Sequence, residues 1–183
     1  MSKGLILIDI QNDYFPDGKM PLVGIEQAAA NAGRLLDQFR EKGLPTFHIQ
    51  HIFQDPNAPF FLPETKGVEI HPSLAPEKNE TVIVKHYPNS FRESALLGAL
   101  RKAGAEEVVI CGAMSHMCVD ATTRAAADFG LKCTLAHDAC ATTNLEFAGK
   151  KIGAEEVHGS YMSALGWAYA ELVGTEDYLK RGD

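Results

Sequence analysis

The chain has 183 residues, of which 45% are hydrophobic and 22% are charged, and its net charge is −7. This composition is ordinary for a globular protein, and residues 1–183 are expected to fold as a single domain. Lys and Arg residues are too scattered to form a nucleic-acid surface, and no apolar run reaches the length of a membrane span. Neither a nucleic acid nor a membrane is therefore expected as a partner.

The four cysteines, Cys111, Cys118, Cys133 and Cys140, form no CxxC pair and no zinc-binding spacing. The N-terminal residues lack the charged, apolar and cleavage regions of a signal peptide. These features predict a cytoplasmic protein with reduced thiols, most of them small core residues.

Strands and helices are predicted to alternate along the chain. Residues 4–10 form a continuous apolar run, typical of a strand that is buried on both faces of a parallel sheet. Apolar residues recur at helical spacing over residues 25–42, and residues 44–53 are predicted to form a second strand. The remaining predicted elements are strands at 81–85, 107–111, 131–136 and 155–158, and helices at about 90–103, 117–129, 145–152 and 160–173.

Residues 54–79 interrupt this alternation with five prolines and little periodicity. A loop of this length in a compact domain commonly lines a site or a subunit contact. The helix after it is expected to begin at a capping box formed by Ser90 and Glu93. The whole pattern predicts an α/β fold, a Rossmann-like three-layer α/β/α sandwich with a mainly parallel sheet of about six strands.

Ligands of such sheets bind beyond the carboxyl ends of the strands, where three polar or reactive side chains are expected to meet. Asp9 ends the first strand and Lys85 ends the third, while Cys118 follows the fourth strand near the start of a helix. Taken alone, Asp9 could equally form a turn, and Lys85 could extend its ammonium group into water. Together they would supply Cys118 with a base and a charge partner.

Cys118 is expected to be the reactive cysteine. The positive end of a helix dipole and a nearby ammonium group both stabilise a thiolate, so the sequence predicts a lowered pKa for its thiol. Backbone N–H groups in the preceding turn could form an oxyanion hole.

Three segments of the chain resemble the triad segments of the isochorismatase-like cysteine hydrolases. They are LILIDIQNDYF with Asp9, VIVKHYPNSF with Lys85, and GAMSHMCVDATTRAA with Cys118. The resemblance covers roughly residues 3–173, and it implies a Rossmann-like fold. It also implies that Asp9 acts as base and then as acid, while Lys85 orients Asp9 and holds the thiolate.

The resemblance further implies how a tetrahedral oxyanion would be held. The backbone N–H groups of Met114 and Cys118 would bind it, and the Ala113–Met114 peptide would be cis. Loss of ammonia or an amine would leave a thioester for water to hydrolyse. A cysteine-dependent hydrolase that cleaves an amide or carbamoyl C–N bond of a small molecule is therefore predicted.

Alternative activities remain within the same family. Isochorismatases proper lack the nucleophilic cysteine and cleave a vinyl ether, so Cys118 argues for acyl transfer. Nicotinamidases carry an Asp-x-His metal motif in the segment after the second strand. The same segment here offers His48, His51 and His71 but no Asp-x-His, and His48 and His51 are expected on opposite faces of a strand. No metal or other cofactor is therefore expected. Hydrolysis of another acyl bond, metal-dependent nicotinamidase activity and a non-catalytic family member stay open as alternatives.

Five further residues are candidates for substrate binding. They are Gln11, Phe15, Tyr87, Phe91 and His116. Turn formation for Gln11 and core packing for the aromatic residues are the competing interpretations. Relatives usually assemble into dimers, tetramers or larger rings, so a homo-oligomer, dimer or tetramer, is expected. Residues 54–79 and the last predicted helix, with Trp167 and Tyr169, are candidates for its contact.

Overall fold

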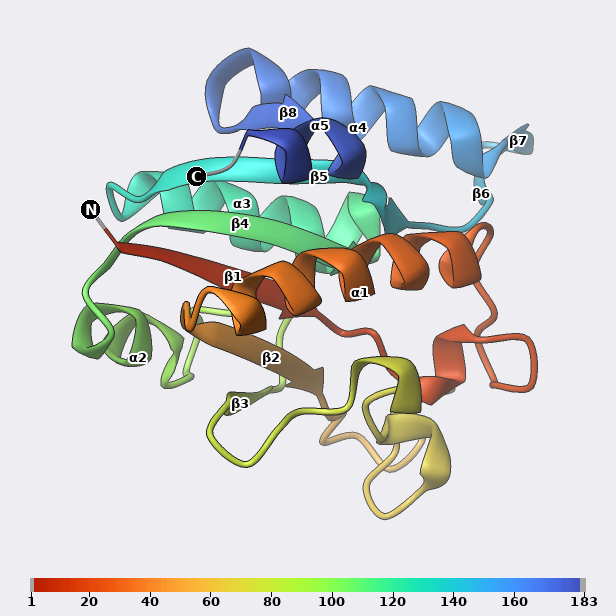
Figure 1. Ribbon diagram of the computed structural model, residues 1–183. Helices are drawn as coiled ribbons and strands as arrows, with labels where there is room; N and C mark the ends of the chain where they lie inside the picture. The colour runs from red at the N-terminus through yellow and green to blue at the C-terminus, as the bar shows by residue number, and fades with distance from the viewer. Residues whose placement is uncertain (1, 182–183) are drawn as a thin grey trace.

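Six parallel strands form the central layer of the computed structural model, which describes residues 2–181 (Figure 1). The strand order is β3-β2-β1-β4-β5-β8, and every neighbouring pair is parallel. The predicted parallel sheet of six strands is confirmed. The strands are β1 (Ser2–Ile8), β2 (Thr46–His51), β3 (Thr81–Lys85), β4 (Ala105–Ala113), β5 (Lys132–Ala141) and β8 (Glu171–Val173).

Helices cover both faces of this sheet, because successive side chains of its buried strands point to opposite faces. Leu5 and Leu7 of β1 join the apolar cluster under one layer of helices, and Ile6 and Ile8 join the cluster under the other. The first layer contains α1 (Ile25–Glu41) and α5 (Thr175–Lys180). The second contains α2 (Leu96–Lys102), α3 (Asp120–Asp128) and α4 (Ala154–Ala168). Among residues 2–181, no helix is both long enough and apolar enough to cross a bilayer.

Residues 54–79 form an ordered loop beyond the carboxyl end of β2. Two short 3-10 turns, η2 (Lys66–Val68) and η3 (Pro72–Leu74), are its regular structure. Phe61 and Leu74 are buried in the α1-side cluster, so the loop is anchored by apolar packing. The loop therefore has a fixed place next to the edge of the sheet at which β1 and β2 end.

The C-terminal third differs from the prediction. A helix was expected at residues 145–152, but β6 (Leu145–Phe147) and β7 (Lys150–Ile152) form an antiparallel hairpin. Its two turn residues, Ala148 and Gly149, have positive φ angles of 51° and 76°. Such a two-residue turn suits the twist of a hairpin and ends any helix at this point.

The remaining C-terminal predictions are also corrected. Residues 155–158 belong to α4 rather than to a strand, and the helix expected to reach residue 173 ends at Ala168. The sixth strand of the sheet is instead β8. Glu155 and Glu156 lie in the first turn of α4, where carboxylates favour the positive end of the helix dipole.

The helix predicted from residue 90 begins later, at Leu96. The expected capping box does not form, because Ser90 is buried and its backbone N–H and hydroxyl both bond the hydroxyl of Thr122. Glu93 has a φ of 51°, which is outside the helical region.

Candidate active site

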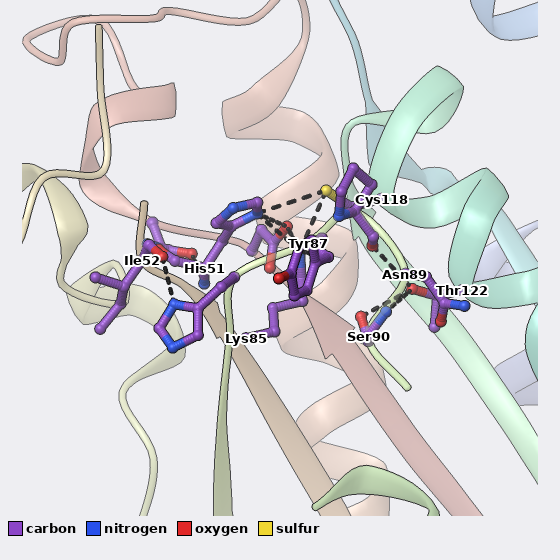
Figure 2. Close-up of polar contacts among 12 residues, drawn as sticks. His51, Ile52, Lys85, Tyr87, Asn89, Ser90, Cys118 and Thr122 are labelled. Carbon is purple, nitrogen blue, oxygen red and sulfur yellow. Dashed lines mark hydrogen bonds and ion pairs between the residues drawn. The ribbon is translucent and has the colours of Figure 1, made fainter. Parts of the chain in front are cut away.

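Three strand ends bring Asp9, Lys85 and Cys118 together. Figure 2 shows Lys85 and Cys118 lying close to each other. Asp9 follows β1, Lys85 is the last residue of β3, and Cys118 lies in a π-helical turn, η4 (Ser115–Val119), that links β4 to α3. The Lys85 Nζ atom lies 2.8 Å from Asp9 Oδ2 and 3.2 Å from Cys118 Sγ. Asp9 and Lys85 are fully buried and Cys118 is 4% exposed, so this polar group is enclosed by the protein.

A close contact between β1 and β4 sets the place of the nucleophile turn. Gly112 has a φ of 125°, and a Cβ atom at this position would lie 2.1 Å from the carbonyl oxygen of Ile8. Only glycine fits there, because both the space and the backbone conformation exclude a side chain. Asp9, the next residue after Ile8, adopts a left-handed backbone with a φ of 52° and donates its N–H to Ile49. The two strands thus end side by side.

The turn that carries Cys118 is fixed by its own backbone. The Ala113–Met114 peptide is cis, at the position for which the family resemblance implies a cis bond. The Met114 carbonyl accepts N–H groups from Met117 and Val119 at 3.0 and 3.2 Å. Single π-helical turns of this kind are frequent at functional sites.

Asp9 and Lys85 form a buried ion pair. Burial alone raises the pKa of Asp9, but the charge of Lys85 and the contact with His51 outweigh it, so the pKa is lowered overall. Burial alone lowers the pKa of Lys85, and the negative charge of Asp9 reverses this, so that pKa is raised. At neutral pH the pair therefore consists of a carboxylate and an ammonium.

Cys118 is a neutral thiol in this setting. Burial and the charge of Asp9 raise its pKa well above the ordinary value, and the opposing effect of Lys85 is smaller. The predicted lowering of the Cys118 pKa is wrong, since it considered the ammonium and the helix end but not the burial of the sulfur beside a carboxylate. The resting site thus pairs an ionised base with a protonated nucleophile, as general-base activation of a thiol requires.

His51 is a fourth member of the site. The sequence suggested this residue only as a possible metal ligand. Its Nδ1 atom lies 2.9 Å from Lys85 Nζ, 3.9 Å from Cys118 Sγ and 3.8 Å from Asp9 Oδ2. His51 and Lys85 are register partners in the β2–β3 pair. Register partners on parallel strands point to the same face, so aligning the two strands would have placed His51 beside Lys85.

Among residues 2–181, the cluster of possible metal ligands at this site does not fit a divalent metal. Asp9, His51 and Cys118 offer ligand atoms within 4.8 Å of one another, but the ammonium of Lys85 contacts all three. The chain therefore places its own cation among these groups. The other two candidate histidines have different surroundings: His48 bonds Glu80 at 2.9 Å, and His71 stacks on Phe15.

Gln11 ties two strand ends to the long loop. Its side-chain nitrogen donates to the carbonyls of His51 and Val68, and its oxygen accepts the N–H of His51 at 2.7 Å. Both amide hydrogens and the oxygen are thus used inside the protein. These contacts favour a structural role for Gln11 over substrate binding.

The aromatic candidates lie in different surroundings. Phe15 stacks on His71 and lines a cavity of about 710 Å³, whose lining residues do not include the Asp–Lys–Cys group. Phe91 packs against Phe129 with ring centroids 5.2 Å apart, in the apolar cluster on the α3 side, which favours core packing. Tyr87 accepts a hydrogen bond from Lys85 through its carbonyl at 3.1 Å, while Arg92 covers its ring.

His116 lies in the same turn as Cys118 and is half-buried. Its Nδ1 atom is 2.6 Å from the hydroxyl of Thr142, and its ring meets Tyr161 edge to face. These contacts hold the ring beside the nucleophile turn and leave its substrate-binding role a prediction.

A three-layer α/β sandwich with an aspartate, a lysine and a cysteine at its strand ends defines a hydrolase-type site. Comparison with protein-family models agrees: the isochorismatase domain matches residues 3–159. This protein belongs to the isochorismatase family and is a hydrolase of that family by its Asp9–Lys85–Cys118 arrangement.

Similar proteins agree with this assignment. An uncharacterized isochorismatase family protein, YddQ of Bacillus subtilis, is 53% identical over 98% of this chain and all of its own length. The crystal structure of a hydrolase of this family from Oleispira antarctica is 48% identical, with a TM-score of 0.95 over 98% of this chain and 96% of that one. A streptothricin hydrolase of Streptomyces noursei is 31% identical over 80% of this chain and 52% of its own length.

Proposed function

We propose that this protein hydrolyses a C–N bond, amide or carbamoyl, of a small molecule through a thioester on Cys118. The observation that carries the proposal is the ammonium of Lys85, 2.8 Å from the Asp9 carboxylate and 3.2 Å from the Cys118 sulfur. One buried cation thus faces both the base and the nucleophile. A negative charge can move from oxygen to sulfur without losing its counter-ion.

In the first half of the reaction, the Asp9 carboxylate takes the proton of the Cys118 thiol, and the sulfur attacks the carbonyl carbon. The oxyanion that forms would be held by the backbone N–H groups of Met114 and Cys118. The carboxylic acid of Asp9 then gives its proton to the nitrogen, the C–N bond breaks, and ammonia or an amine leaves.

In the second half, water attacks the thioester and gives one proton to Asp9, now a carboxylate again. The C–S bond breaks, the acid product leaves, and the thiolate recovers its proton from Asp9. The net result adds one water across the C–N bond. Lys85 stays protonated throughout, so it acts as a fixed charge and not as a proton carrier.

The family's named members support a hydrolytic role. The similarity to a streptothricin hydrolase, 31% identical over 80% of this chain and 52% of its own length, supports this role. The buried position of Cys118 suits a substrate of low molecular weight rather than a protein chain.

A screen for ammonia or amine release tests the proposal. Small amides, ureas and carbamoyl compounds should include a substrate, and turnover of this substrate should be the same with added zinc and with a chelator. The substitution Cys118→Ala should lower kcat by roughly a thousandfold or more, since the nucleophile is lost.

Cys133→Ala is the matched control, because Cys133 is another buried cysteine that packs in the core. It should retain turnover. Full activity of the Cys118→Ala variant would contradict the proposed nucleophile, and activity that depends on zinc would contradict the metal-free mechanism.

We further propose a cytoplasmic location and assembly into dimers or tetramers. The four cysteines are all free and buried, which suits a reducing compartment. Trp167 on α4 is 90% exposed, and a large apolar side chain of this kind is a candidate for a subunit contact.

A further inference from the structure

The hydroxyl group of Ser115 links the nucleophile turn to two neighbouring elements. Ser115 is fully buried and is the first residue of η4, directly after Met114. Its Oγ atom lies 2.8 Å from His158 Nδ1 on α4 and donates to the carbonyl of Ala141, the last residue of β5, at 3.3 Å. The turn that carries Cys118 is thus bonded to a helix and to a strand through one side chain.

These bonds differ from those within the turn. Two N–H groups of the turn bond the carbonyl of Met114, so they close the turn on itself. The Ser115 hydroxyl instead fixes the turn against the sheet. Ala141 pairs with Ala113 in the β4–β5 register, so the bond from Ser115 continues the contact between these two strands beyond the end of β4.

The hydrogen atoms of the Ser115–His158 pair follow from the available donors. A serine hydroxyl has one hydrogen and the carbonyl of Ala141 can only accept, so this hydrogen points to Ala141. Burial lowers the pKa of His158, so its ring is neutral at neutral pH and has a single N–H group. That group lies on Nδ1, where it meets the lone pairs of the Ser115 Oγ atom. The imidazole therefore donates to Ser115, and Ser115 donates to β5.

A serine beside a histidine is also the pattern of an activated nucleophile. Ser115 lacks the access that such a role requires, because it is fully buried and its hydrogen is bonded to Ala141. A general base accepts the hydroxyl proton, whereas His158 donates to the oxygen. The pair therefore supports the turn and is not a second nucleophile.

We propose that His158 is a positioning residue of the active site: its Nδ1–H group holds the Ser115 hydroxyl and thereby keeps the oxyanion-binding N–H groups of the nucleophile turn aligned. Those groups belong to Met114 and Cys118, which lie on either side of Ser115 in the chain. Donors to an oxyanion are effective when they are oriented in advance, and a displacement of about 1 Å can cost roughly a hundredfold in rate. The effect on turnover rests on the proposed function, whereas the effect on the order of the turn does not.

Asparagine and glutamine distinguish the two nitrogens of the imidazole. The amide of His158→Asn lies near the place of Nδ1 and can donate to Ser115, while the longer side chain of His158→Gln carries its amide to the place of Nε2. Ser115→Ala removes the hydroxyl itself. His137→Gln is the matched control, because His137 lines the same cavity as His158, whereas the bond to Ser115 comes from His158.

The kinetic test measures kcat and KM with a substrate from the amide screen. His158→Gln and Ser115→Ala should each lower kcat about tenfold with KM unchanged, because aligned N–H groups act on the transition state. The double variant should also lose about tenfold, since both substitutions remove one shared interaction. His158→Asn should return kcat to within about threefold of wild type, and His137→Gln should match wild type.

Hydrogen exchange, followed by NMR, tests the order of the turn without a substrate. The amide groups of Met117 and Val119 report on the turn, because both bond the Met114 carbonyl. They should exchange about tenfold faster in His158→Gln than in wild type, while β1 should exchange at the wild-type rate. Thermal unfolding of every variant checks that the fold is retained.

A wild-type kcat in His158→Gln would overturn the proposal, as would unchanged exchange of the turn amides. So would a His158→Asn protein as slow as His158→Gln, since altered packing of α4 would then be the cause. A loss of about a hundredfold in the double variant would also contradict it, because the two side chains would then act separately. Faster exchange of the turn in a protein that hydrolyses no amide would contradict the proposed function and still support the hold of His158 on the turn.

Discussion

At the scale of single residues, one enclosed environment moves two pKa values in opposite directions. The charge of Lys85 keeps the pKa of Asp9 below its ordinary value, while burial and the charge of Asp9 raise the pKa of Cys118. Two titratable groups separated in this way divide into a base and a proton donor. Asp9 is the acceptor and Cys118 the donor, and this assigns the direction of the first proton transfer.

The pH dependence of kcat/KM should follow from these shifts. Asp9 must be ionised, and its pKa is lowered, so activity should be lost only as the pH falls below about 3.9. Lys85 must be protonated, and its pKa is raised, so activity should be lost only above about pH 10.4. A flat profile over the neutral range is expected, measured where the protein stays folded. An inflection between pH 6 and 8 would point to a histidine as the base instead.

The sequence could predict those residues of the site that lie at the ends of strands. Asp9, Lys85 and Cys118 were found because the carboxyl ends of parallel strands share one edge of the sheet. His51 was missed in this role because its contact with Lys85 depends on the register of β2 against β3. Likewise, the bonds that occupy Gln11 come from the long loop, whose course no sequence pattern gives.

At the scale of elements, helices and strands with strong hydrophobic periodicity were predicted correctly, and short segments were not. The apolar run of β1 and the helical spacing of α1 were assigned within a few residues. The hairpin of β6 and β7 was mistaken for a helix, since each strand has three residues and too little pattern to separate the two. Its turn residues decide the structure through positive φ angles.

The hairpin turn offers a stability test. Ala148 has a φ of 51°, a left-handed conformation that asparagine adopts at a lower cost in free energy than alanine does. The substitution Ala148→Asn should therefore raise the free energy of unfolding by roughly 0.5 kcal/mol. Gly149→Ala should lower it by about 1 kcal/mol, because Gly149 has a φ of 76°. Chemical denaturation measures both. A stabilising Gly149→Ala substitution would contradict the turn geometry.

At the scale of the whole molecule, the six-stranded sheet supplies the edge on which the site is built. The strand order places β1 at the centre, between β2 and β4, so the ends of β1 to β4 lie next to one another. Asp9, His51 and Lys85 come from three adjacent strands, and Cys118 follows the fourth. The fold thus brings together residues up to 109 positions apart, Asp9 and Cys118.

The oligomeric state is a prediction at this scale. Light scattering should give a dimer or tetramer for the wild-type protein, and Trp167→Lys should shift it toward the monomer if α4 forms the contact. The reason is that Trp167 is 90% exposed in the single chain and a lysine there would oppose apolar burial. A wild-type protein that is monomeric at all concentrations would contradict the expected assembly.

The most direct test of the central claim is capture of the thioester. The protein is mixed with a substrate from the amide screen, quenched with acid within one turnover, digested and analysed by mass spectrometry. The mechanism predicts that the peptide containing Cys118 gains the mass of the acyl group, and that the Cys118→Ala protein gains none. Turnover by the wild-type protein with the acyl group on another residue, or undiminished turnover without Cys118, would contradict it.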